Sequence, residues 1–242
     1  MTINLTPKTD RIAYLNVNEI FGPTIQGEGV HTGHRVGFLR LAGCNLACVW
    51  CDTPYSWDWS RYDKNEESHK MTIEAIAEQI APMDAKRLIV TGGEPMLQQR
   101  HFKALRDATG CKLDIETNGT IEPKPEAIEA VDMFVVSIKL AHAGDSDELR
   151  IKWEAIFKFA ELSEQGKAIF KFVAKDSMDF EEIREIVDAA CIPAEAVYIM
   201  PEGVTPDAQL DGMRRIADFV IEEGWNMSPR LHTLIWGLER GH

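Results

Sequence analysis

The stretch RLIVTGGEP, residues 87–95, sets the pattern from which the fold follows. A short β-rich run ends there in a glycine-rich turn, and four later runs repeat the pattern, most of them separated by segments of helical period. Those runs are KLDIE (112–116), MFVVSI (133–138), AIFKFVA (168–174) and AVYIM (196–200). Such alternation predicts βα units and a parallel sheet.

Two alternating segments at 11–20 and 35–41 predict an N-terminal strand pair, joined by a long glycine-rich loop. Roughly five or six βα units fall short of the eight in a complete barrel, so we expect an α/β fold with a partial, open βα barrel. The chain has 242 residues with no internal repeat or Pro- or Ser-rich linker. This favours a single domain over residues 1–242.

The segment 146–162 has the clearest helical period after these strands. Its spacing predicts one buried stripe that includes two aromatic side chains, and we interpret these as core residues. The stripe consists of Leu149, Trp153, Ile156, Phe157 and Ala160. A second helix is predicted at 72–81, after an exposed polar stretch at 60–70.

Composition excludes several classes of protein. Hydrophobic residues make up 45% of the chain and charged residues 27%, which is typical of a globular domain. A formal net charge of −13 provides no general attraction to nucleic acid or to an anionic membrane. The charged first residues do not resemble a signal peptide, and no apolar run is long enough to span a bilayer. We therefore expect a cytoplasmic protein that binds neither nucleic acid nor membrane.

The segment LAGCNLACVWCDT, residues 41–53, has the spacing C-x-x-x-C-x-x-C directly after a predicted strand. One loop can thus direct the sulfurs of Cys44, Cys48 and Cys51 at a common centre, and soft thiolates select zinc, copper(I) or an iron–sulfur cluster. A closed zinc site needs a fourth ligand; His31 and His34 precede the loop, but no second ligand pair follows it. Three cysteines on a 4Fe-4S cluster leave one iron open to another ligand. The cluster is favoured, with zinc as the alternative.

Cys111 and Cys191 have no ligand spacing around them. We expect both to be buried, inert thiols.

Trp50 stands directly before the last cysteine of the loop, and TGGEP (91–95) follows a predicted strand. Together these features resemble the two signatures of the radical S-adenosylmethionine (SAM) superfamily. The resemblance implies that the open iron binds SAM, which the reduced cluster cleaves to a 5′-deoxyadenosyl radical. The protein must then place one substrate C–H bond beside the radical carbon.

Further segments extend the resemblance over most of the chain, to the 7-carboxy-7-deazaguanine synthase family. They are GPTIQGEG (22–29), the cysteine loop ending in CDT, VTGGEPMLQ (90–98), DIETNGT (114–120), VSIK (136–139) and LHTLIWGLERG (231–241). This implies a homodimeric enzyme with a shortened barrel that contracts the ring of 6-carboxy-5,6,7,8-tetrahydropterin, with loss of ammonia, to the 7-deazapurine precursor of queuosine-type nucleosides. It also implies Mg²⁺, catalytic use of SAM and a one-electron donor such as a flavodoxin.

The resemblance also implies the site residues. It implies that Cys44, Cys48 and Cys51 bind the 4Fe-4S cluster. The SAM contacts fall to Trp50, Cys51, Asp52, Gly93, Glu94, Ser137, Ile138, Lys139, Met200 and Pro201. The substrate contacts fall to Ile25, Gln26, Gly27, Glu28, Arg40, Thr91 and His242, and the Mg²⁺ ligand is Thr53. No acid or base catalyst stands out.

The residue types suit these roles to different degrees. Gln26 and Glu28 match the amide and amino edge of a pterin by their donors and acceptors. Arg40 can bind a carboxylate in bidentate fashion, although an exposed strand arginine is the alternative. Thr53 needs substrate oxygens and waters to complete an octahedron around Mg²⁺, and without the resemblance we would interpret it as a helix cap.

Three further residues have two interpretations each. Glu116 and Asn118 end a predicted strand on the expected active face, but Asn-Gly is also a common turn. His232 is either a site residue or a buried core histidine.

The sequence is also compatible with two functions other than the synthase. A radical SAM activase, which installs a glycyl radical on a partner protein, would share the cysteine loop and GGEP. It would not need QGEG, CDT and LHTLIWG together. A non-catalytic zinc module is the third possibility.

Overall fold

The computed structural model describes residues 13–237 and 239–241; the substrate contact predicted at His242 lies outside them. In the described part of the chain, nine strands form one sheet in the order β3-β1-β2-β4-β5-β6-β7-β8-β9, whose two end strands do not pair with each other. The strands are β1 (Tyr14–Ile25), β2 (Arg35–Leu41), β3 (His69–Thr72), β4 (Arg87–Gly92), β5 (Lys112–Thr117), β6 (Met133–Val136), β7 (Ala168–Ala174), β8 (Val197–Pro201) and β9 (Asn226–Met227). This confirms an α/β fold with an open barrel.

Strand direction divides the sheet into two parts. β1 runs antiparallel to both β2 and β3, whereas every pair from β2 to β9 is parallel. The N-terminal strand pair and all five predicted β-rich runs are therefore confirmed, but β1 continues to Ile25, into the segment predicted as the connecting loop. The sequence did not predict β3, which begins inside the polar stretch 60–70, or the two-residue β9.

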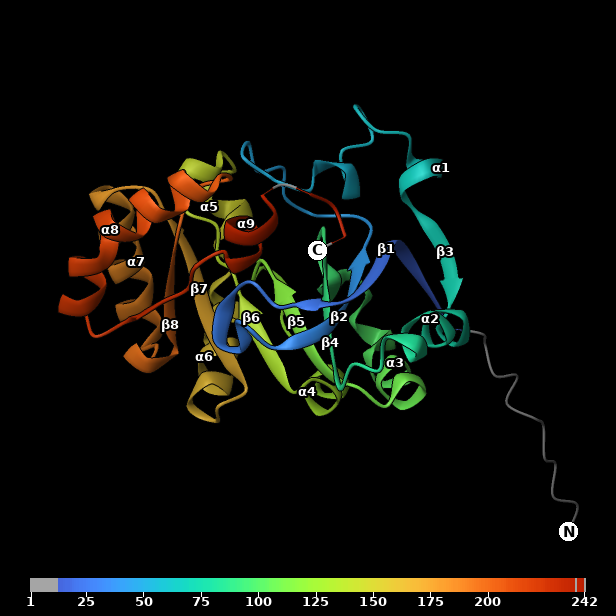
Figure 1. Cartoon of the computed structure of the whole chain (residues 1–242). Coiled ribbons are helices and arrows are strands. Elements are labelled where there is room, and N and C mark those ends of the chain that lie inside the picture. The colour runs from blue at the N-terminus through green and yellow to red at the C-terminus, as the bar shows by residue number, and fades with distance from the viewer. Residues whose placement is uncertain (1–12, 238, 242) are drawn as a thin grey trace, which may run out of the picture.

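Helices connect the parallel strands, and Figure 1 shows α9 and the C-terminal end returning to the middle of the molecule. The α-helices are α1 (Lys64–Glu67), α2 (Ile73–Ile80), α3 (Phe102–Thr109), α4 (Pro125–Ala130), α5 (Asp147–Arg150), α6 (Trp153–Glu164), α7 (Ser177–Ala190), α8 (Pro206–Glu222) and α9 (Leu231–Trp236). The 3₁₀ helices are η1 (Gly29–His31), η2 (Pro54–Ser56), η3 (Ala81–Met83), η4 (Pro95–His101), η5 (Ala141–Ala143) and η6 (Ala194–Ala196). None of the described helices is long and apolar enough to cross a membrane.

The predicted stripe at 146–162 is wrong in part. Leu149, Trp153 and Phe157 are 51%, 38% and 47% exposed, while Ile156 and Ala160 are buried as expected. The helix breaks between α5 and α6, so the two pieces do not share one continuous face. In α5 the buried side chain is Arg150, the neighbour of Leu149. Its guanidinium donates to the Lys139 carbonyl oxygen at 2.9 Å and pairs with the Glu182 carboxylate.

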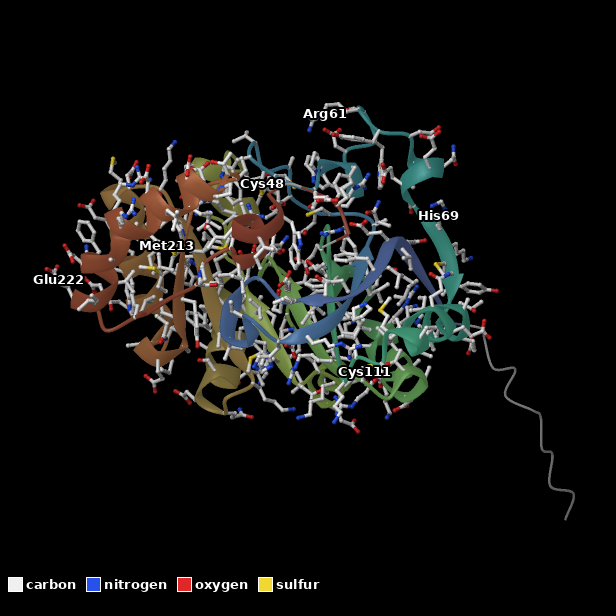
Figure 2. All side chains as sticks on the ribbon, viewed as in Figure 1. Cys48, Arg61, His69, Cys111, Met213 and Glu222 are labelled. Atoms are coloured by element: carbon white, nitrogen blue, oxygen red, sulfur yellow. The ribbon has the colours of Figure 1, made fainter. Side chains whose placement is uncertain are left out.

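The two isolated cysteines differ in burial. Cys111 is buried, as predicted, and its Sγ donates to the carbonyl oxygen of Ala85. Cys191 is exposed, so that prediction is wrong; it ends α7 in the left-handed region, with φ at 50°. Figure 2 shows Cys48 and Cys111 on opposite sides of the molecule, near opposite ends of the parallel strands. The cysteine loop therefore lies where the parallel strands end, and Cys111 where they begin.

Candidate active site

A cavity of about 780 Å³ opens at the carboxyl ends of the strands. A cavity of this size suits a small-molecule site. Most of the predicted site residues line it: Ile25, Gln26, Gly27, Glu28, Arg40, Cys44, Cys48, Trp50, Cys51, Asp52, Thr53, Thr91, Gly93, Ser137, Lys139, Met200 and Pro201. Two predicted SAM contacts, Glu94 and Ile138, are only 1% exposed and do not line it. Glu116, Asn118 and His232, which had two interpretations each, also line this cavity.

The two signature loops are joined through their backbones. The amide of Gly93 donates to the Leu41 carbonyl oxygen at 3.0 Å, and the amide of Glu94 donates to that of Gly43 at 2.8 Å. A Cβ on Gly93 would lie 2.1 Å from the Gly43 oxygen, and one on Gly92, whose φ is +135°, would lie 2.1 Å from the Leu41 oxygen. Both glycines are therefore required by close approach of the two loops.

Glu94 connects this joint to the end of β5. Its Oε1 accepts from the Met96 amide at 2.9 Å and from the Thr117 hydroxyl at 2.7 Å, and its Oε2 accepts from the Asn118 amide at 2.7 Å. Burial raises the pKa of Glu94 although these hydrogen bonds oppose the shift. The carboxylate thus holds TGGEP against ETNGT from behind the cavity wall.

The three thiols of the cysteine loop face the cavity and have few polar partners. Trp57 Nε1 donates to Cys51 Sγ at 3.3 Å, and the Leu46 amide donates to Cys44 Sγ at 3.5 Å. Burial raises the pKa of Cys44 to about 11 and that of Cys48 to about 12. Such thiols lose their protons readily only when a metal group binds them.

The donor set fits an iron–sulfur cluster better than one metal ion. Over residues 13–237 and 239–241, no three His, Cys, Asp or Glu side chains are arranged to bind a single metal ion. A four-iron cluster does not need three side chains that meet at one metal ion, because each thiolate binds a different iron. His31, a possible fourth zinc ligand, instead pairs through Nδ1 with Asp114 Oδ2 at 2.6 Å and does not line the cavity. His34 does not line the cavity either, so neither of the two histidines considered as a fourth zinc ligand faces the three cysteines.

Lys139 and Trp50 lie beside the cysteine loop. Lys139 Nζ donates to the Ser137 carbonyl oxygen at 2.8 Å and to its hydroxyl at 2.9 Å, and lies 6.0 Å from the centre of the Trp50 ring. Burial lowers the pKa of Lys139. The indole Nε1 of Trp50 is buried and finds no acceptor among the described residues. An unpaired buried donor in the wall of a cavity suits a polar ligand.

A buried ionic network also lines the cavity and reaches the cysteine loop. The Glu28 carboxylate accepts from Lys171 on Oε2 and from Arg230 on Oε1 at 3.0 Å, and Arg230 also pairs with Asp52 of the cysteine loop. Burial raises the pKa of Glu28, but Lys171 and Arg230 outweigh it and hold that pKa well below its ordinary value. Glu28 is thus an anion that two cations already hold.

Glu116 is a further carboxylate in the lining of the cavity. Gln26 Nε2 donates to Glu116 Oε1 at 3.0 Å, and both residues line the cavity. His232 packs against the same loop so closely that a Cβ on Gly27 would lie 2.0 Å from its Nδ1. Burial lowers the pKa of His232, which keeps the ring neutral.

Thr53 is placed at the start of η2. It occupies the position before the helix, but its side chain makes no capping hydrogen bond there. Its Oγ1 lies 3.8 Å from Cys51 Sγ, at the cavity surface. This contact is a hydrogen bond in which either atom can donate, and a hydroxyl oxygen keeps a lone pair for a further ligand beside it.

Several lining residues were not predicted from the sequence. Lys171 had a detectable signal, because it is the one charged residue within the apolar run AIFKFVA. Others gave none, since they lie in ordinary strand, turn or C-terminal segments; they include Glu19, Phe21, Phe38, Tyr55, Trp57, Val173, Arg230 and Arg240.

Comparison with known proteins identifies the family. The model of the radical SAM superfamily matches residues 39–162. A 7-carboxy-7-deazaguanine synthase from Pyrobaculum aerophilum is 36% identical over 230 residues, which cover 94% of this chain and 97% of that protein. The chain belongs to the 7-carboxy-7-deazaguanine synthase family. It is therefore also a member of the radical SAM superfamily, as the sequence resemblance indicated.

A further relative supports the family, and a solved structure supports the fold. A 7-carboxy-7-deazaguanine synthase from Hyperthermus butylicus is 35% identical, with 91% of this chain and 92% of that protein covered. The crystal structure of QueE from Escherichia coli has a TM-score of 0.65 and 24% identity, and covers 90% of this chain and 95% of that one. The second likeness supports the fold of this family member, an open radical SAM barrel.

Proposed function

We propose that the chain converts 6-carboxy-5,6,7,8-tetrahydropterin to 7-carboxy-7-deazaguanine with loss of ammonia, in 7-deazapurine biosynthesis. One observation carries the proposal: a single cavity joins the cysteine loop to the QGEG loop and Arg40. Relatives that carry the synthase name match nearly the whole chain. No feature of the described residues favours the alternative, an activase that must admit a protein segment.

The residues of one wall fit a 4Fe-4S cluster and SAM. Cys44, Cys48 and Cys51 would hold the cluster. Trp50, Asp52, Gly93, Ser137, Lys139, Met200 and Pro201 would surround SAM, with Glu94 and Ile138 supporting this wall from behind. When bound, the cluster and SAM supply a carbon-centred radical, and SAM is regenerated at each turnover.

The other wall would bind and orient the pterin. Glu116 and Gln26 would meet its amide and amino edge, because a carboxylate accepts and a carboxamide both donates and accepts. Gly27 and Ile25 shape the loop around the ring, with Glu28 behind it and Thr91 at the β4 end. Arg40 would bind the substrate carboxylate, and Thr53 would contribute one ligand to Mg²⁺ whose other ligands are substrate oxygens and water.

Domain number, oligomeric state, location and partners are properties of the whole protein. We infer a single domain, a homodimer and a cytoplasmic location, with a flavodoxin-like protein as electron donor. The net charge of −13 supports the absence of nucleic-acid and membrane partners. A contact of the pterin with His242 stays a prediction.

The test is an anaerobic incubation of cluster-reconstituted protein with reductant, SAM, Mg²⁺ and 6-carboxytetrahydropterin, followed by mass spectrometry. Many equivalents of 7-carboxy-7-deazaguanine per chain are expected while SAM persists. Cleavage of SAM to 5′-deoxyadenosine without that product would refute the proposed substrate.

A further inference from the structure

Arg40 is held in the cavity wall by one carboxylate and two aromatic rings. Its Nε donates to Glu19 Oε1 at 2.6 Å. The guanidinium carbon lies 5.7 Å from the centre of the Phe21 ring and 6.0 Å from that of the Tyr55 ring. The Tyr55 hydroxyl donates to the same Glu19 oxygen at 3.4 Å.

The contact with Glu19 uses only part of the guanidinium. An arginine has five N–H donors in a planar fork, of which Nε carries one. Nη1 and Nη2 of Arg40 donate to no other described residue, although the side chain is only 15% exposed and lines the cavity. The two Nη groups are the part that binds a second carboxylate in bidentate fashion.

A bulge in β1 creates this arrangement. Val17 pairs with Leu41 and Glu19 pairs with Arg40, so Asn18 is an extra residue in β1. Without it, Asn18 would lie opposite Arg40, and Glu19 would point to the other face of the sheet. The bulge therefore places a carboxylate directly beside the arginine on the cavity side. A β-bulge that redirects a side chain is a common feature of active sites.

We propose that Glu19 is a positioning residue: it fixes Nε of Arg40 so that Nη1 and Nη2 point into the cavity and select a ligand that carries a carboxylate. This rests on the proposed function, because the carboxylate is that of the pterin substrate. The arginine then bridges two carboxylates, one from the protein and one from the ligand.

Burial and charge at this position agree with that role. Burial lowers the pKa of Arg40, but Tyr55 and Glu19 outweigh it, so the guanidinium stays charged. Without Glu19, the buried Nε–H would lack its acceptor, and the side chain would turn toward another one. A glutamine at position 19 keeps an acceptor oxygen, so geometry and charge can be separated.

The test is equilibrium dialysis of two probes, 6-carboxypterin and pterin, against anaerobic holoenzyme with SAM and Mg²⁺. The ratio of their two dissociation constants measures the preference for the carboxylate. The variants are Glu19→Ala and Glu19→Gln. The matched control is Glu223→Ala. It breaks a carboxylate–arginine pair of 2.6 Å between Arg184 of α7 and the residue that follows α8, and neither residue lines the cavity.

We expect wild type and Glu223→Ala to prefer 6-carboxypterin strongly. Glu19→Ala should reduce that preference by roughly tenfold or more, the size expected for a charge-assisted hydrogen bond, with little change for pterin. Glu19→Gln should keep the preference within about threefold of wild type, because the acceptor is retained.

Two results would overturn the inference. An unchanged or stronger carboxylate preference in Glu19→Ala would mean that Glu19 competes with the ligand for Arg40. Loss of the preference in Glu19→Gln would mean that Glu19 contributes through its negative charge and not by positioning Arg40. Failure of wild type to bind either probe would instead reject the pterin substrate class, and the inference with it.

Discussion

The buried network around Glu28 predicts a large penalty for Lys171→Met. Lys171 is 6% exposed and Glu28 13% exposed, so the substitution leaves a carboxylate in the cavity wall with one cation fewer. Breaking a buried pair costs about 3–5 kcal/mol. Because Arg230 still donates to Oε1 of Glu28, we expect the low end of this range, about 3 kcal/mol. For a chain of this size, that corresponds to a fall of roughly 6–12 °C in the thermal midpoint.

The assay is thermal unfolding of the anaerobic, cluster-loaded protein at pH 7, beside two comparison variants. Lys158→Met breaks an exposed pair with Glu161 and should change the midpoint by about 2 °C or less. Lys171→Met combined with Glu28→Gln should recover part of the loss, because the double variant no longer buries a carboxylate that has lost one of its two cations. Equal midpoints for Lys171→Met and Lys158→Met would refute the reasoning.

The same network has a defined pH dependence. The folded-state pKa of Glu28 is depressed, since Lys171 and Arg230 outweigh the effect of burial. Its stabilisation is therefore present above the pKa of an unfolded glutamate, about 4.3, and is lost as the pH falls below it. The difference between Lys171→Met and wild type should accordingly shrink in acid.

Three further outcomes are expected. Gly27→Ala should abolish product formation while the cluster still assembles, because its Cβ would lie 2.0 Å from Nδ1 of His232; normal turnover would show that the loop adapts. Iodoacetamide should label the exposed Cys191 of the cluster-loaded protein well before the buried Cys111, as peptide mass spectrometry would report, and equal rates would contradict the burial. Thr53→Ala should raise the Mg²⁺ concentration for half-maximal activity with little change in the thermal midpoint, since the hydroxyl caps no helix; an unchanged Mg²⁺ dependence would remove Thr53 as a ligand.

The sequence predicted the parallel strands, because short apolar runs rich in β-formers, such as AIFKFVA, are typical of strands buried on both faces. It did not predict β3, whose residues HKMT are half-exposed and become a strand only by pairing with β1. The stripe at 146–162 failed for a tertiary reason. Arg150 is buried against the Lys139 carbonyl oxygen and Glu182, and the periodicity of apolar residues does not show such partners.

The candidate site also has a part that the sequence predicts and a part that it does not. Cysteine spacing and glycine turns are local features, so the sequence predicts the two loops that carry them. The structure adds that the loops touch at Gly92 and Gly93, where a Cβ would collide with the other loop's backbone. The positions of Glu19 and Arg230 depend on contacts distant in sequence. Glu19 meets Arg40 through a bulge, and Arg230 meets Glu28 across most of the chain. No spacing rule for a single segment reveals such pairs.

The central claim is that SAM and the pterin occupy one cavity and exchange a hydrogen atom there. The most direct test is turnover of 6-carboxytetrahydropterin deuterated at C6 by the reconstituted enzyme, with mass spectrometry of both the product and the recovered SAM. We expect 7-carboxy-7-deazaguanine together with deuterium in the SAM pool. Product formation with SAM that stays unlabelled would contradict hydrogen transfer between the pterin and SAM.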